Sequence, residues 1–309
     1  MPYTKRSEMY ERQRDERRRR TRRQIVLVTL LAVMVCFIFV ILGAWISKGQ
    51  EPEEQPTTVA ETAEPAFTIS CLEDVVLPDD VPAINVQYTG FRVSFNPVHH
   101  IPNYSAWELI GAETEGEVPR YSKFAADPDV YGCPSSSDYS HSGYDRGHMA
   151  PAADMKWSEQ AMIDSHYMTN VCPQNHVLNS GRWSTLEKKC RQWAQRDSSL
   201  VIICGPVLTD DLPTAIGSCG VTVPARFFKV IMAPYNNPPS AIAFVMPNSG
   251  NVDQLEALVH SVDDVEAITG YDFFACLPDS IENAIEAESD YKYWNRRLRY
   301  PERAKVGVR

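Results

Sequence analysis

The pattern of hydrophobic and polar positions divides the chain into an apolar run and two strongly polar flanks. Residues 25–46 form a run of 22 residues without a single charge. As a helix this run spans roughly 33 Å, which matches the hydrocarbon core of a bilayer. A signal peptide is the alternative, but its apolar region is usually shorter, and no clear cleavage site of small residues follows Trp45. We therefore predict one uncleaved transmembrane helix over residues 25–46.

The segment after the apolar run is too polar to fold on its own. Residues 50–66 contain three prolines and five glutamates. Such a segment cannot bury enough apolar surface to offset the entropy lost on ordering. We predict a flexible acidic linker over residues 47–66 and a folded domain over residues 67–309.

Several segments of the folded domain carry the alternation or continuous hydrophobicity of strands. Residues 84–88 and 91–95 alternate apolar and polar positions around a Thr-Gly turn, which predicts a hairpin. Three apolar runs further along predict buried strands, at residues 199–204, 226–232 and 241–246.

Helical periodicity is clearest after residue 182. Trp183, Leu186, Cys190 and Ala194 recur at three-to-four spacing, which predicts an amphipathic helix. Two weaker helical patterns cover residues 252–262 and 278–288. Strands and helices mixed without regular alternation predict an α+β fold.

Charge is distributed unevenly and adds an orientation to the predicted anchor. Residues 1–24 form a basic arm with ten Lys and Arg against four acids, a net charge of +6. By the positive-inside rule, this arm is cytoplasmic and everything after Lys48 is exported, either periplasmic or extracellular. Attraction to anionic lipid explains the arm more simply than a nucleic-acid-binding tail does. The rest of the chain has 20 basic and 36 acidic residues, a net charge of −16.

Seven cysteines follow the apolar run. If the domain is exported, disulfides are expected, and an odd number leaves at least one thiol unpaired. The sequence does not determine which cysteines are joined. A structural zinc site is the alternative, but it usually needs a Cys-x-x-Cys pair, and the sequence has none.

The most reactive combination of side chains occurs in residues 145–151. Their sequence is Asp145-Arg146-Gly147-His148-Met149-Ala150-Pro151. A carboxylate, a guanidinium and an imidazole fall within four residues, together with a glycine that would let the backbone approach a ligand closely. A lone histidine is more often structural than catalytic, but these neighbours favour a phosphate site.

A second polar cluster, residues 168–191, leads into the predicted amphipathic helix. Asn179 stands just before that helix, and Glu187 and Arg191 lie one turn apart on it. This spacing can present a carboxylate and a guanidinium side by side. A loop or capping role for Asn179 and a solvated surface ion pair explain the same spacing equally well.

Residues 145–151 resemble the signature of the DNA/RNA non-specific endonucleases, a family of ββα-metal nucleases. The resemblance extends over roughly residues 88–274, because further matching residues follow in the order and approximate spacing of the family. They are Asn170, Pro173-Gln174, Asn179, Trp183, Glu187, Arg191, Gly205-Pro206, Val223-Pro224, Phe244 to Asn248, Val262 to Glu266 and Thr269 to Phe274.

The resemblance implies a ββα-metal fold with a central, mostly antiparallel sheet flanked by helices. It also implies that His148 is the general base and that Asn179 binds Mg²⁺ directly, with Mn²⁺ or another divalent cation as the alternative. Glu187 would bind the same ion through water.

The resemblance further implies which groups hold the phosphate. Arg146, Arg191 and Asn170 would donate hydrogen bonds to it, and Asp145 would position a neighbouring arginine or the backbone. The expected products carry a 5′-phosphate.

The expected substrates are DNA and RNA without sequence preference, since contacts to phosphate and metal carry no base information. The sequence does not give the oligomeric state; the resemblance makes a homodimer one possible assembly, because relatives are often dimers. Two other functions stay open: an inactive nuclease-like binding module, and a phosphodiesterase acting on a substrate other than nucleic acid. The net negative charge of the exported part differs from the basic patch that is usual in nucleic-acid-binding proteins. A local basic rim could still be formed by Lys156, Arg182, Lys188, Lys189 and Arg191.

Overall fold

The structure is a computed structural model, and it describes residues 68–208 and 214–296. The predicted basic arm, membrane anchor and linker lie outside the described residues. Within the described part, no helix is both long and apolar enough to cross a bilayer.

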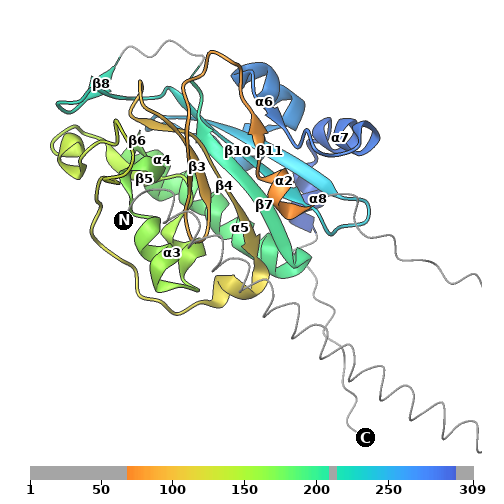
Figure 1. The fold of residues 1–309 in the computed structure, drawn as a ribbon. Coiled ribbons are helices and arrows are strands. Elements are labelled where there is room, and N and C mark those ends of the chain that lie inside the picture. The colour runs from red at the N-terminus through yellow and green to blue at the C-terminus, as the bar shows by residue number, and fades with distance from the viewer. Residues whose placement is uncertain (1–67, 209–213, 297–309) are drawn as a thin grey trace, which may run out of the picture.

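A seven-stranded sheet forms the centre of the domain (Figure 1). Its strands lie in the order β12-β11-β10-β7-β4-β3-β2, and every neighbouring pair is antiparallel. Its strands are β2 (Ile84–Gln87), β3 (Arg92–Asn96), β4 (Ile101–Ile110), β7 (Ser199–Pro206), β10 (Arg226–Ala233), β11 (Ser240–Pro247) and β12 (Val259–His260). The predicted hairpin and the three predicted apolar strands are therefore confirmed.

Strand β4 is the main element that the sequence pattern did not reveal. It pairs with β3 on one side and β7 on the other, yet it carries the buried polar residues Asn103 and Ser105. The Asn103 amide donates to the hydroxyl of Ser94, and Ser105 donates to Asn170. Polar residues satisfied in this way break the apolar pattern without breaking the strand.

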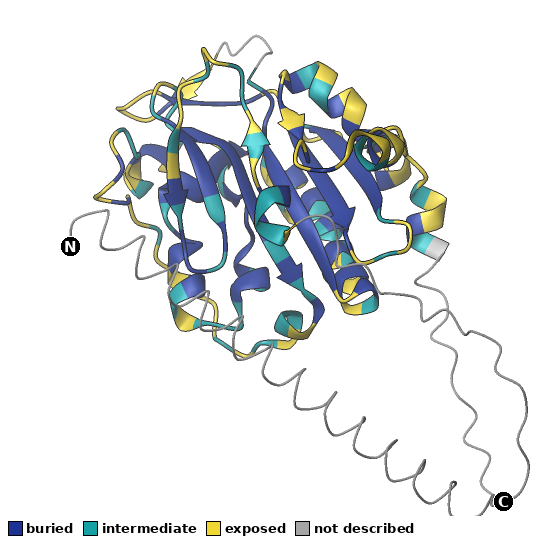
Figure 2. Cartoon of the chain, turned by 45° about the vertical axis from the view of Figure 1, so that its right-hand side comes forward, coloured by how far each residue is buried: buried dark blue, intermediate teal, exposed yellow. Residues whose placement is uncertain are grey.

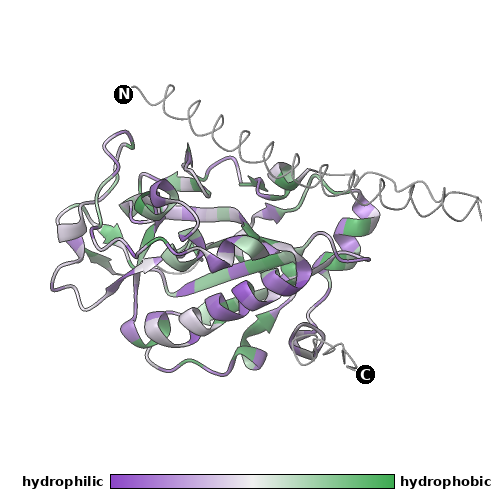
Figure 3. Cartoon of the chain, turned by 90° about the horizontal axis from the view of Figure 1, so that it is seen from below, coloured by the Kyte–Doolittle hydropathy of each residue, from purple (hydrophilic) through white to green (hydrophobic). Residues whose placement is uncertain are grey.

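The sheet separates two hydrophobic cores, and its strands are buried almost throughout (Figure 2). One core contains Trp107, Trp183 and Leu186, and helix α5 (Ser184–Asp197) lies over it. The other core contains residues of α6 (Val262–Thr269) and α7 (Asp279–Glu286). Hydrophilic and hydrophobic residues alternate along the helical ribbons, as expected for helices with one buried face (Figure 3).

A strand pair followed by a helix lies on the α5 side of the sheet. Strands β5 (Asp145–His148) and β6 (Val171–Gln174) are antiparallel, and the chain then enters α4 (His176–Leu178), a π-helical turn η5 (Asn179–Trp183) and α5. This succession is the ββα unit that the family resemblance implied. Leu186, Cys190 and Ala194 are buried on α5, which confirms the predicted amphipathic helix.

The remaining elements cover the edges of the domain. They are α2 (Ile69–Leu72), β1 (Val75–Val76), η1 (Gly111–Glu115), η2 (Ser136–Tyr139), η3 (Ala152–Met155), α3 (Glu159–Asp164), η4 (Met168–Asn170), β8 (Ala215–Ile216), β9 (Val221–Thr222), η6 (Leu255–Leu258), β13 (Asp272–Phe273) and α8 (Tyr291–Arg296). The helix predicted over residues 278–288 is confirmed as α7. The helix predicted over residues 252–262 is wrong, because that segment divides into η6, β12 and the start of α6.

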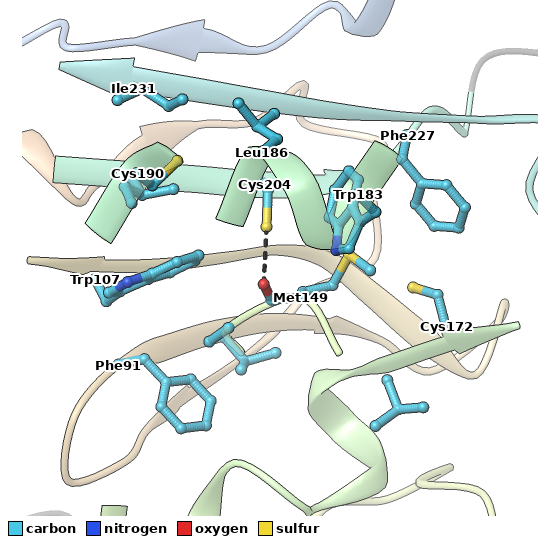
Figure 4. Close-up of a cluster of buried hydrophobic side chains, with 14 of the residues drawn as sticks. Phe91, Trp107, Met149, Cys172, Trp183, Leu186, Cys190, Cys204, Phe227 and Ile231 are labelled. Carbon is cyan, nitrogen blue, oxygen red and sulfur yellow. Dashed lines mark hydrogen bonds between the residues drawn. The ribbon is translucent and has the colours of Figure 1, made fainter. Parts of the chain in front are cut away.

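A disulfide joins Cys71 to Cys276 and links the start of the domain to the segment between β13 and α7. The other five cysteines of the described residues carry free thiols. Of these, Cys204 is buried under α5 and donates to the carbonyl oxygen of Met149 (Figure 4).

Candidate active site

His148 ends strand β5 and lies deep in the candidate site. Only 8% of the residue is exposed, and within the described residues its Nε2 atom has no hydrogen-bond partner. The rings of Phe124 and His166 lie 5.0 and 4.8 Å from its ring. Its carbonyl oxygen accepts a hydrogen bond from the Trp183 indole at 3.3 Å, which fixes β5 against the following helix.

The surroundings of His148 favour its neutral form. Burial lowers the pKa of His148 well below its usual range, and the nearby His166 and Arg120 lower it further. A neutral imidazole with an unpaired ring nitrogen can accept a proton. The sequence did not indicate His166 or Arg120, because both are far from the motif along the chain.

Asp145, at the other end of β5, positions Asn179. The Asn179 amide nitrogen donates to Asp145 Oδ2 at 2.9 Å, and His176 Nδ1 lies 2.8 Å from the same oxygen. Asp145 therefore orients the amide and an exposed histidine, rather than the arginine or backbone that we predicted. This hydrogen bond uses the nitrogen of the Asn179 amide, so the amide oxygen is the atom suited to bind a cation.

The π-helical turn η5 aligns Asn179 with Glu187. Eight residues along an ideal α-helix turn the second side chain by about 80° away from the first. A π turn accommodates one extra residue, so the eight-residue separation becomes equivalent to about seven, which returns the two side chains to one face. The spacing of Asn179 and Glu187 therefore suits this interrupted helix.

Glu187 shares a partly buried cluster of charges with Lys229, Asp154 and Arg191. Burial raises the pKa of Glu187 to about 7, Asp154 also raises it, and Lys229 and Arg191 lower it. Arg191 donates to Asp154 at 2.7 Å. The Arg191 guanidinium forms an ion pair with a buried carboxylate through one nitrogen, and its predicted role in holding a phosphate stays a prediction.

Lys229 is a buried lysine that the sequence pattern did not reveal. It lies within the apolar strand β10, only 1% exposed, with its Nζ 4.4 Å from the ring centre of Trp183 and 5.2 Å from that of Trp107. The faces of the two rings attract the ammonium group. Its positive charge, on strand β10, lowers the pKa of the Glu187 carboxyl on helix α5.

Arg146 is held beside the candidate base. Its guanidinium donates to the Ser136 carbonyl oxygen at 2.6 Å and lies 5.9 Å from the ring centres of both Phe124 and Tyr139. Phe124 contacts the His148 ring as well. The structure therefore brings Arg146 and His148 together around Phe124, and their roles as phosphate-binding arginine and base stay predictions.

Asn170 lies in the same region, but its side chain is fully used inside the protein. Its Oδ1 accepts from the Ala150 N–H and the Ser105 hydroxyl, both at 2.9 Å. Its Nδ2 donates to the carbonyl oxygens of Ala150 and Ser165, both at 2.9 Å. The predicted phosphate contact is thus replaced by four bonds that fix the chain just after His148.

The structure explains the glycine at position 147 by close packing of two strands, and not by the close approach of a ligand that we predicted. A Cβ atom at this position would lie 2.2 Å from Gln174 Oε1 and 2.7 Å from Gln174 Cβ. The glycine therefore permits β6 to pack closely on β5. Close approach of a ligand is not needed to explain it.

Several residues of the basic rim predicted around the site have hydrogen-bond or ion-pair partners within the protein. The Arg182 guanidinium donates to the Asp253 carbonyl oxygen, and Lys189 donates to Asn295. With Arg191 paired to Asp154, three of the five predicted rim residues are engaged inside the protein. Exposed Arg120 adds a cation that the sequence pattern had not indicated.

The residues present fit the Mg²⁺ ion that the family resemblance implies. An amide oxygen of Asn179 and the carboxylate of Glu187 are hard oxygen donors, as this ion requires. Both belong to the helical segment that follows β6, and Asn179 is hydrogen-bonded to Asp145 at the start of β5. Asn179 would hold the ion directly and Glu187 through water.

A strand pair, an interrupted helix and a buried neutral histidine together define a ββα-type hydrolytic site. Comparison with known proteins gives the family: the chain belongs to the DNA/RNA non-specific endonucleases, whose family pattern matches residues 75–280.

Curated relatives include mitochondrial nucleases. The chain is 37% identical over 207 residues to zebrafish (Danio rerio) "Nuclease EXOG, mitochondrial", covering 62% of this chain and 60% of the relative. It is 32% identical to the human protein of the same name, covering 62% and 56%. A protein called "Nuclease" from Nostoc is 31% identical, covering 69% of this chain and 80% of that one. The match thus spans only about three fifths of the mitochondrial proteins.

A solved structure shares the fold. The crystal structure of the EndoG/EndoGI complex aligns with a TM-score of 0.58 over 63% of this chain and 87% of that one, at 24% identity. This likeness supports the large antiparallel sheet with its flanking helices.

Proposed function

We propose that this protein is a divalent-metal-dependent, sequence-non-specific endonuclease that cleaves DNA and RNA to products with 5′-phosphates. One observation carries the proposal: the buried His148 has an unpaired Nε2 and a lowered pKa, next to a helix that aligns an amide oxygen with a carboxylate. The family and its nuclease relatives support the same activity.

His148 acts as the general base in this proposal. Its neutral ring accepts a proton from the water that attacks phosphorus, and the hydrogen bond from Trp183 to its backbone holds the strand in place during this step. Asn170 fixes the following residues through Ala150 and thereby limits movement of the base.

Arg146 binds the phosphate and stabilises the charge that develops on it. Its contact with Ser136 and the rings of Phe124 and Tyr139 orient the guanidinium beforehand, so little ordering is left for the substrate to induce. A bound Mg²⁺ would supply further neutralisation of phosphate charge. Asn179 would hold this ion directly, and Glu187 would hold it through water.

We also propose that the domain is exported and tethered to a membrane by residues 25–46, with the N-terminus in the cytoplasm. The charge-free run and the basic arm before it support this orientation. The disulfide between Cys71 and Cys276 adds support, since such bonds persist in oxidising compartments. Dimerisation stays a prediction.

Digestion of plasmid DNA and of RNA by the full chain, with Mg²⁺ or with EDTA, tests the activity. We expect cleavage of both polymers only with the metal, and a loss of about 10²–10⁴-fold in the His148→Ala variant. His260→Ala is the matched control, because His260 lies on β12, outside the site. Intact polymers after incubation with wild-type protein and Mg²⁺ would refute the proposal. Equal cleavage by His148→Ala would refute the role of the base alone.

A further inference from the structure

A group of three carboxylates lies on the face of the sheet opposite the candidate active site. Asp263 and Glu266 belong to α6, and Glu286 is the last residue of α7. One carboxylate oxygen from each lies within 4.8 Å of the other two. Both helices contribute to the second hydrophobic core, whereas the candidate active site lies against the first. The group is therefore separate from Asn179 and Glu187.

Glu286 makes this group more than a set of surface acids. The residue is only 6% exposed, and in the described part of the chain its Oε1 atom is buried without any hydrogen-bond partner. A buried carboxylate oxygen without a donor is costly, because it has lost its water and gained nothing in return. Its carboxylate is directed at those of Asp263 and Glu266, which offer only further negative charge.

In the part of the chain that the structure describes, no basic side chain forms an ion pair with this group. Across residues 68–208 and 214–296, none of the three carboxylates forms an ion pair with Lys or Arg. Burial raises the pKa of Glu286 to about 8, and the neighbouring acids raise it further: Glu266, Glu282, Asp263 and Asp272. Glu266 keeps one compensating bond, from the Phe273 N–H at 2.8 Å.

We propose that Asp263, Glu266 and Glu286 bind a divalent cation, with Ca²⁺ as the best fit. All donors are carboxylate oxygens, which suit hard cations and exclude ions that need nitrogen or sulfur. Ca²⁺ accepts many oxygens in irregular geometry, whereas Mg²⁺ requires a nearly ideal octahedron and keeps most of its water. The exposed Asp263 leaves an entry path and room for water ligands.

Such an ion would join two helices that otherwise share few contacts. It would fix the end of α7 to the first two turns of α6, and its positive charge would compensate the buried Glu286 carboxylate. The site is structural in this inference, and it does not depend on the proposed nuclease activity. A cation that binds the folded protein but not the unfolded chain would raise the melting temperature.

Thermal melting of the full chain at neutral pH, with and without millimolar Ca²⁺, tests the site. All variants are made in an Asn179→Ala background, so that an ion at the candidate active site does not contribute. We expect Ca²⁺ to raise the melting temperature by about 2–5 °C in this background. Glu286→Gln should abolish the rise. Glu288→Gln, an exposed carboxylate two residues further along, should retain it.

Calorimetric titration with Ca²⁺ should give one binding event that Glu286→Gln removes. If Glu286→Gln does not fold, Asp263→Asn serves instead, because its exposed side chain tolerates the change. A Ca²⁺-dependent rise that survives both variants would overturn the proposal. No rise in the Asn179→Ala background would overturn it as well and would mean that the group shares a proton instead of a metal ion.

Discussion

The residues of the motif divide into those that face the substrate and those that hold them in place. His148 and Arg146 present an imidazole and a guanidinium to the candidate site. Asp145 and Asn170 act on other residues, through Asn179 and Ala150 respectively. Asp145 and Asn170 thus contribute to the candidate site by positioning other residues.

Gly147 gives the first prediction at this scale. Gly147→Ala should lower the free energy of unfolding by about 1–3 kcal/mol, because the new Cβ overlaps Gln174. The loss should be smaller in a Gln174→Ala background, which removes the closest atom. Gly181→Ala is the control, since nothing lies within 4 Å of a Cβ there. Urea unfolding of the four variants measures the coupling, and equal losses in both backgrounds would contradict the explanation.

Arg120 should contribute to the position of the acid limb of the pH profile, after burial and His166. Its positive charge opposes protonation of His148, whose pKa burial has already lowered. The acid limb is measured at saturating Mg²⁺, which favours the ionised form of Glu187. Because the base works in its neutral form, activity under this condition should persist below pH 6.5, the usual pKa of histidine. Arg120→Gln should raise the His148 pKa and move the acid limb of kcat/KM to higher pH. Lys123→Gln, an exposed change in the same segment, should leave the limb in place. A limb that does not move in Arg120→Gln, or moves to lower pH, would contradict this role.

At the scale of elements, periodicity predicted α5 and the apolar strands because burial on one face repeats at a fixed spacing. It failed for β4, where Asn103 and Ser105 are buried but hydrogen-bonded. The resemblance to the family predicted Asn179 and Glu187 as site residues. It did not predict the π turn that aligns them, because that turn depends on local hydrogen bonds and not on the spacing of apolar residues. Lys229 was missed because it interrupts an apolar strand and is solvated by tryptophan rings instead of water.

The electrostatic interaction between Lys229 on β10 and Glu187 on α5 gives a prediction about metal dependence. Lys229 lowers the pKa of Glu187, which burial raises to about 7. Removing the positive charge in Lys229→Met should raise that pKa further, so a higher pH is needed to ionise the carboxylate that binds metal-bound water. The Mg²⁺ concentration for half-maximal activity should therefore increase in Lys229→Met, most strongly at or below pH 7.

Lys189→Met is the control for this prediction. Lys189 lies on α5, as Glu187 does, but its side chain contacts Asn295 and Tyr291. A Lys229→Met protein with an unchanged Mg²⁺ requirement across this pH range would show that Lys229 serves only the fold.

At the scale of the whole molecule, the two faces of the sheet differ in charge. The arginines near His148 lie on one face, and the carboxylates of α6 and α7 lie on the other. The acids of α6 and α7 repel a polyanion, whereas the arginines near His148 attract it locally. The arginines beside His148 thus give a chain with a net charge of −16 after its basic arm a local site for a phosphate.

The disulfide stabilises the face opposite the candidate site. It joins residues separated by 205 positions, Cys71 and Cys276, so reduction frees a very long loop in the unfolded chain. The double variant Cys71→Ser/Cys276→Ser should lose about 2–4 kcal/mol of unfolding free energy. Nuclease activity well below the melting temperature should remain, because α5 and the ββα unit belong to the other core. Cys219→Ser, an exposed free thiol, is the control and should match wild type in both measurements. Loss of activity in the double variant before any loss of structure would show that the two faces are coupled through the sheet.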